Sequence, residues 1–252
     1  MARTSGGRSA LSRVVDVLDA FAVDAPTLTL SDIAERAQLP LSSCHRIVAE
    51  LVSHGFLERV HERRYRIGAR LWELGTRTPG VLGLRELAVP FLHGVQSHVR
   101  QHVQLVVQAG LDALVIERLS ARTAVLNASI IGGRTPLELS SGGLVLIAFG
   151  DPRLVDDVIA RGLADGSGGA ARTPAELRER VELVRAEGYA VTAGYIVPES
   201  RGVAVPIRGS ERNVVGALSV VVGNDDSPID DYVRILRVAA AGISEDLLRS
   251  YL

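Results

Sequence analysis

Apolar residues recur at helical spacing in three short segments near the N-terminus. In the segment 9–21, the residues on one helical face are Leu11, Val14, Val15, Leu18 and Phe21. Within 29–57, the two repeating sets are Ile33, Ala34 and Ala37, then Cys44, Ile47, Val48 and Leu51. Pro40 and Gly55 bound the last of these helices, because proline favours a helix start and glycine a helix end. Two helices joined by a short turn predict a helix-turn-helix, whose second helix lies in the major groove of DNA.

The polar residues of this helix pair suggest how it contacts DNA. Ser31 is the expected N-cap of the first helix, because its hydroxyl can accept from the free N–H groups of the first turn. With the apolar residues turned inward, polar residues face outward from the first half of the second helix. The residues expected to contact DNA are Ser31, Ser42, Ser43, His45 and Arg46. Serine and histidine can bind phosphates or base edges, and arginine can form two bonds to guanine. The spacing alone leaves open a helix pair that only packs into a core.

Alternating apolar and polar residues after Gly55 predict a two-stranded hairpin over 56–67. A basic hairpin that follows a helix-turn-helix makes a wing. Arg63, Arg64 and Arg66 are expected beside the DNA backbone or in the minor groove. For the hairpin taken by itself, the alternative is a charged tip that only faces solvent.

The pattern changes beyond the segment 77–80, Arg-Thr-Pro-Gly, which is the best candidate for a domain boundary. A linker helix is expected over 77–98, with Pro90 as the site of a kink or of a new helix start. Strands are expected over 102–110 and 112–119 as a hairpin, near 124–130, and over 189–192, 203–207 and 214–222. Helices are expected over 140–149, 152–161, 174–187 and 229–248. Strands in mixed order with helices predict an α+β fold with a mainly antiparallel sheet. The expected domains are therefore 1–76, a linker helix over 77–98, and 99–252.

Composition and charge restrict the class of protein. A chain of 252 residues that is 47% apolar can bury a sizeable core, and its apolar runs are far shorter than a membrane span. The N-terminal residues carry no apolar stretch typical of a secretory signal, and the single cysteine suits a reducing cytoplasm. The net charge is −1, but residues 1–70 hold ten arginines against eight acidic residues. Four of these arginines lie within 59–66, which has the right sign for DNA binding.

Six stretches of the chain resemble the IclR family of bacterial transcriptional regulators. They are 11–21, 28–59, 65–75, 132–148, 187–207 and 213–222, and the order Pro40, Ser42, Ser43, His45, Arg46 matches the family's recognition helix. The resemblance implies a winged helix-turn-helix joined by a linker helix to a GAF-like effector-binding and oligomerisation domain. It implies cytoplasmic homodimers or homotetramers on palindromic double-stranded operators. Organic or aromatic acids would change the DNA affinity, and a repressor is favoured over an activator.

The resemblance also places an effector pocket at the start of the helix near 140 and on the later strands. The candidate effector-binding residues are Ser140, Ser141, Gly142, Gly143, Thr192, Tyr195, Gly202, Ser219 and Val221. Residues 140–143 would offer free N–H groups to a carboxylate, with capping and close packing as their alternative role. Relatives that bind small acids use an acidic residue, a cysteine and two serines here, and only Ser219 is retained. We therefore expect a less polar pocket that takes a larger or more apolar ligand than glyoxylate, or none.

Enzymes and metal sites form the competing classes. The sequence has no Gly-x-Ser-x-Gly elbow, no His-Glu-x-x-His and no dinucleotide-binding glycine motif, and no cofactor is expected. All basic residues are arginine, which excludes a Schiff-base lysine. His98 and His102 could share a metal if both were helical, but no third ligand lies nearby. Cys44 is expected to be a small core residue. A ligand-independent regulator or a partner module remains the alternative, against which Arg46 and the basic hairpin argue.

Overall fold

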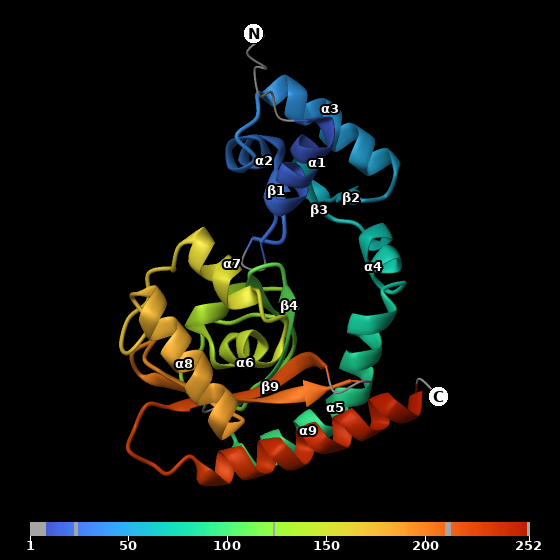
Figure 1. Cartoon of the computed structure of the whole chain (residues 1–252). Coiled ribbons are helices and arrows are strands. Elements are labelled where there is room, and N and C mark those ends of the chain that lie inside the picture. Colours follow the sequence, from blue (N-terminus) through green and yellow to red (C-terminus); the bar gives the residue numbers. More distant parts are fainter. Residues whose placement is uncertain (1–8, 23–24, 123, 210–212, 251–252) are drawn as a thin grey trace. The chain divides into compact units, whose positions relative to one another are not determined.

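A computed structural model describes residues 9–22, 25–122, 124–209 and 213–250. Contacts within the chain divide it into two compact units, Met1–Pro79 and Gly80–Leu252 (Figure 1). Each unit has hydrophobic core residues of its own. In the part of the chain that is described, no helix is both long enough and apolar enough to cross a membrane.

The described part of the N-terminal unit consists of helices around a small sheet. Its helices are α1 (Ala10–Asp19), α2 (Leu30–Arg36), α3 (Leu41–Ser53) and α4 (Ala69–Gly75), with the 3-10 turn η1 (His61–Arg63). Its strands are β1 (Leu28–Thr29), β2 (Leu57–Arg59) and β3 (Arg64–Ile67). The apolar faces of the first three helices form the core, where Val17, Ile33 and Cys44 are fully buried. The helix-turn-helix and the core position of Cys44 are therefore as the sequence predicted.

One local prediction in this unit was wrong, and another was incomplete. Thr29, and not Ser31, caps α2: the Thr29 hydroxyl accepts from the Asp32 backbone at 3.2 Å, and the Asp32 carboxylate accepts from the Thr29 backbone at 2.9 Å. These bonds to Thr29 lower the pKa of Asp32. The predicted hairpin is formed, because β2 pairs antiparallel with β3, and β1 adds a third strand that was not predicted, in the order β1-β3-β2. The pairing of β1 with β3 keeps Thr29 extended, so the helix begins at the residue after it.

The C-terminal unit is built on one antiparallel sheet in the order β6-β5-β4-β9-β8-β7. The strands are β4 (His102–Ala109), β5 (Asp112–Leu119), β6 (Arg134–Pro136), β7 (Ala190–Ala193), β8 (Ser200–Arg208) and β9 (Val214–Gly223). The strand predicted near 124–130 is not formed, and β6 follows this coil instead. Two side chains explain the difference. The Gln101 Oε1 accepts from the backbone N–H of Val125 at 2.9 Å, and the His102 Nε2 lies 2.6 Å from the carbonyl oxygen of Val125. These bonds hold the segment without a partner strand.

Helices cover both faces of this sheet (Figure 1). On one face lie α5 (Pro79–Val99) and α9 (Asp230–Ser250); on the other lie α6 (Ser141–Phe149), α7 (Leu154–Arg161) and α8 (Pro174–Glu187), with the 3-10 turn η2 (Leu137–Leu139) before α6. The α5 helix continues through Pro90, and its buried residues Leu84, Ala88 and Leu92 pack into the core of this unit. The α+β fold predicted from the sequence is confirmed.

Candidate DNA interface and ligand cavity

The outward face of α3 carries small polar and charged side chains. Ser42, His45 and Arg46 are exposed and Ser43 is half-buried, while the apolar residues between them face the core. The side chains of His45 and Arg46 make no hydrogen bond or ion pair with any described residue. Pro40, the residue before the helix, makes no side-chain cap. The first-turn N–H groups of α3 therefore remain open to an anion such as a DNA phosphate.

The three arginines of the wing are not equivalent. Arg66 forms an ion pair with Glu58 at 2.8 Å, which lowers the pKa of that carboxyl group. Arg64 donates to the carbonyl of Thr27 at 3.2 Å. Arg63 is exposed and has no such bond to a described residue, and its left-handed backbone, with φ of 59°, places it at the turn between β2 and β3. Arg63 is therefore the wing arginine most available to DNA. Ser31 is exposed in the first turn of α2.

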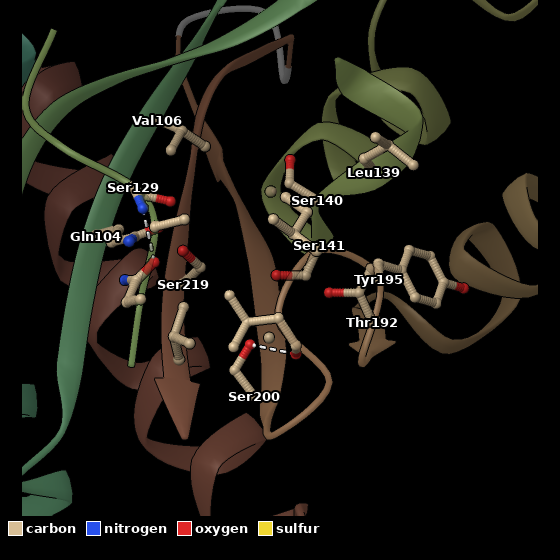
Figure 2. A pocket seen from close by; sticks show the side chains of 17 residues that line it. Gln104, Val106, Ser129, Leu139, Ser140, Ser141, Thr192, Tyr195, Ser200 and Ser219 are labelled. Carbon is tan, nitrogen blue, oxygen red and sulfur yellow. Dashed lines mark hydrogen bonds between the residues drawn. The ribbon is translucent and has the colours of Figure 1, made fainter. Parts of the chain in front are cut away.

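A cavity lies between the start of α6 and the sheet face that carries α6, α7 and α8 (Figure 2). Strand register sets its floor. One cross-strand row consists of His102, Val221, Gly202 and Thr192, and the next consists of Gln104, Ser219, Ala204 and Ala190. Residues opposite one another in an antiparallel sheet share a face, so side chains from four strands meet here. The cavity has a volume of about 70 Å³ within about 540 Å³ of empty space, part of which is open solvent.

The structure brings eight of the nine candidate effector residues to this cavity. They are Ser140, Ser141, Gly142, Thr192, Tyr195, Gly202, Ser219 and Val221. Gly143 does not line it: a Cβ there would lie 2.1 Å from the carbonyl oxygen of Leu137, so this glycine lets α6 pack closely on the turn before it. The Gly143 backbone also donates to the Ser140 hydroxyl at 3.0 Å. For Gly143, the structure thus shows capping and close packing.

Sequence reasoning missed several lining residues. They are Gln104, Val106, Asn127, Ala128, Ser129, Leu139, Ile196, Val197 and Ser200. Gln104 had a signal in the sequence, because it is a polar residue inside the apolar run 103–107, which is typical of a strand buried on both faces. The coil residues 127–129 had none.

The described part of the lining carries no charge, and it mixes hydroxyl and amide groups with apolar side chains. Among the 17 described lining residues there is no aspartate, glutamate, arginine or histidine. Hydroxyls and amides come from Gln104, Asn127, Ser129, Ser140, Ser141, Thr192, Ser200 and Ser219. Such a lining can bind a ligand through hydrogen bonds and apolar contacts, without a charged side chain among the described residues.

Three buried polar atoms of the lining have no partner among the described residues: Gln104 Nε2, Asn127 Nδ2 and the Tyr195 hydroxyl. Burial also raises the pKa of the Tyr195 phenol. The first N–H groups of α6, those of Ser141 and Gly142, lack acceptors within the helix. In Figure 2, Ser140, Ser141 and Thr192 lie on one side of the cavity and Gln104 and Ser129 on the other, with Ser219 between them. The cavity therefore offers donors on two opposite sides.

The coil that lines one side of the cavity is tied to the sheet through His102. Its Nε2 bonds the carbonyl of Val125 at 2.6 Å, and its Nδ1 lies 2.9 Å from the Ser120 hydroxyl and 3.2 Å from Arg118 Nη2. Burial is the main cause that lowers the pKa of His102. His98 lies on α5 while His102 is in β4, so the two histidines do not share a helix as a metal pair would require.

A helix-turn-helix with an exposed arginine on its outward face, in a chain whose second unit holds a cavity, is typical of a transcription regulator. Comparisons with known proteins agree with this class. Residues 10–61 match the IclR helix-turn-helix domain, and residues 78–245 match the bacterial transcriptional regulator IclR C-terminal domain. The chain belongs to the IclR family of bacterial transcriptional regulators. It is a transcription regulator with a DNA-binding helix-turn-helix and a C-terminal effector domain, and not an enzyme.

Individual relatives cover nearly the whole chain. The HTH-type transcriptional regulator XynR of Escherichia coli is 28% identical, over 94% of this chain and 96% of its own length. An IclR homologue from Microbacterium hydrocarbonoxydans, solved in complex with 4-hydroxybenzoate, is 42% identical with a TM-score of 0.88, covering 95% of this chain and 99% of that one. An IclR homologue from Microbacterium sp. strain HM58-2 is 41% identical with a TM-score of 0.62, covering 95% and 98%.

Proposed function

We propose that this protein is a ligand-responsive regulator whose effector is a small aromatic monocarboxylic acid bound in the cavity beside α6. The observation that carries the proposal is the neutral, donor-rich lining, with free N–H groups at the start of α6 and no charged side chain among the described lining residues. The Microbacterium hydrocarbonoxydans homologue, which was solved with 4-hydroxybenzoate, supports this ligand class.

The helix start favours one carboxylate and not two. A helix N-terminus carries about half a positive charge, and its free N–H groups suit a single anion. A second carboxylate would be buried among neutral side chains, where it has no cation to offset its desolvation. Val106, Leu139 and Val221 supply apolar surface that suits a ring. Glyoxylate and pyruvate are too small to fill this surface.

The DNA side of the proposal concerns the operator and the assembly. A single α3 reads one half-site, so we infer that two copies bind a palindromic operator as a homodimer or within a homotetramer. Ser42, Ser43, His45 and Arg46 would contact bases and nearby phosphates, with Ser31 and the wing arginines on the backbone. We favour repression, because covering a promoter requires no further contact, whereas activation requires a surface for polymerase. The site of action would be the cytoplasm, where the bacterial DNA lies.

The test is a titration of the full chain with aliphatic and aromatic acids, read by thermal shift and by gel shift on its operator. We expect 4-hydroxybenzoate to raise the melting temperature and to change operator affinity. Glyoxylate and pyruvate should do neither. Tight binding of glyoxylate would contradict the ligand class. Operator binding that no acid changes would favour the alternative, a ligand-independent regulator.

A further inference from the structure

Two side-chain amides of the cavity lack a hydrogen-bond partner for their nitrogen. Gln104, on β4, is 5% exposed, and its Nε2 has no partner among the described residues. Asn127, on the coil after β5, also has its Nδ2 buried without one. The other end of the Asn127 amide is fixed, because its Oδ1 accepts from the Ser129 backbone at 3.0 Å. Its nitrogen is therefore the end left over for another group.

Gln104 lies in a strand whose neighbouring residues are apolar, so a glutamine with no hydrogen-bond partner for its nitrogen among the described residues requires an explanation. Its neighbours in β4, Val103, Leu105 and Val106, are buried apolar residues, so packing alone would accept a leucine or methionine here. A buried donor without an acceptor is unfavourable relative to such a residue. A half-turn of the terminal amide exchanges its nitrogen and oxygen, so the N–H groups can be directed into the cavity. The cavity is thus the place from which an acceptor can come.

The two donor groups of the cavity lie on opposite sides. Ser141, at the start of α6, faces Gln104 across the space, with Ser219 between them (Figure 2). The α6 end carries partial positive charge and suits the carboxylate. The amides are neutral and suit an uncharged oxygen. A ligand that satisfies both sides has a carboxylate at one end and an acceptor at the other.

We propose that Gln104 and Asn127 form a donor pair that binds an oxygen substituent on the effector's ring, opposite its carboxylate. This inference rests on the proposed function and adds a specificity rule to it. The ligand class is then the para-oxygenated benzoates. The two amides select them over benzoates whose para substituent is apolar.

The experiment measures affinities by isothermal titration calorimetry on the full chain. The probes are 4-hydroxybenzoate and 4-methylbenzoate, since a methyl group is similar in size to a hydroxyl but accepts no hydrogen bond. We expect the wild type to bind 4-hydroxybenzoate at least about tenfold more tightly. In Gln104→Met this ratio should fall below about threefold, while the affinity for 4-methylbenzoate stays within about threefold of wild type.

Control variants separate the donor pair from general effects on the fold. Gln108→Met changes an exposed glutamine of the same strand, whose amide donates to the carbonyl of Gly110, and should keep the wild-type ratio. Asn127→Leu should lower the ratio as Gln104→Met does. Asn127 lies on a coil and not in a buried strand, so Asn127→Leu is less disruptive to the fold. If Gln104→Met does not fold, Asn127→Leu still tests the donor pair.

Each outcome bears on a different statement. A wild type that binds both acids equally overturns the donor pair and leaves the aromatic-acid effector standing. A ratio that survives both Gln104→Met and Asn127→Leu also overturns it. If neither acid binds the wild type, the proposed effector class is wrong and the donor pair falls with it.

Discussion

The outward face of α3 and the cavity beside α6 both keep polar groups without partners among the described residues, in opposite surroundings. Arg46 and Arg63 are exposed, so water solvates them until DNA arrives. The Gln104 amide is buried, and leaving such a donor unpaired costs about 1–3 kcal/mol. The exposed arginines of the DNA-binding face therefore cost the fold little stability. The buried amide of the cavity lowers the stability of the ligand-free protein, and only a ligand with a matching acceptor can complete its hydrogen bonds.

This contrast separates affinity from selectivity. Arginines on α3 and the wing attract any DNA, and base contacts add the sequence preference. The cavity carries no charge among its described lining residues, so it attracts little by long-range forces and must discriminate by shape and by hydrogen bonds. Substitutions in the two regions should therefore change different measurements.

The largest effect is expected from Arg46→Ala on operator binding. A side chain that contacts a base or phosphate well contributes about 1–3 kcal/mol, so affinity should fall at least about tenfold. Fluorescence anisotropy with a labelled operator at a fixed salt concentration measures the operator affinity. Arg234→Ala, on α9 with a side chain 74% exposed, is the matched control. Unchanged affinity in a variant with an unchanged circular dichroism spectrum would remove Arg46 from the interface.

Filling the cavity should abolish the response to ligand and spare DNA binding. A Cβ at Gly202 would lie 2.7 Å from the Ser141 hydroxyl and 2.8 Å from that of Thr192. Gly202→Val should therefore lower the affinity for 4-hydroxybenzoate by about tenfold. This corresponds to a loss of about 1.4 kcal/mol in binding free energy, because the added side chain overpacks the cavity. Operator affinity without ligand should stay near wild type. Gly94→Val, where a Cβ meets nothing within 4 Å, is the control. Loss of operator binding in Gly202→Val would show that the two regions are not separable in this way.

Removing the unpaired amide should stabilise the ligand-free protein. Gln104→Met replaces a buried donor by an apolar group of similar length, so unfolding free energy should rise by about 1 kcal/mol. For a unit of this size, that raises the melting temperature by roughly 2–4 °C. Differential scanning calorimetry measures the shift, and Gln108→Met should show almost none. A lower melting temperature in Gln104→Met would indicate that this amide already supports the fold.

The smallest effect is expected at the wing. Arg63→Ala should reduce the slope of log affinity against log salt by about 1, because one phosphate contact is lost. Binding isotherms over a range of salt concentrations give the slope. Arg153→Ala, which removes an exposed arginine paired with Asp151 in the other unit, should leave it unchanged. An unaltered slope in Arg63→Ala would place the tip of the wing away from the DNA.

Much of the N-terminal unit could be predicted because its signals are local. The helices α1, α2 and α3 have apolar residues at helical spacing, and Pro40 and Gly55 mark the ends of α3. The cap of α2 was assigned to Ser31 because both serine and threonine are good caps. Only the pairing of Thr29 with Arg64, residues distant in sequence, decides between them. The third strand of the wing escaped prediction for the same reason, since two residues carry no periodicity.

The cavity was less predictable, because its lining comes from five separate segments of the chain. Most of the predicted residues came from the family resemblance and not from any pattern in their own segments. The coil at 127–129 was expected to be a strand, and its place is set by bonds from Gln101 and His102. Gly143 was expected in the pocket, and its position against Leu137 shows close packing instead.

The sequence by itself determined the helix-turn-helix, the α+β class, the order of most helices and strands and the exposed arginines. These properties depend on spacing and on charge, both of which are written in consecutive residues. The tertiary structure decided which wing arginine is unpaired, which polar atoms are buried without partners, and that the cavity is neutral yet rich in donors. These properties depend on strand register and on side chains from distant segments that compete for the same hydrogen bonds. No local pattern encodes that competition.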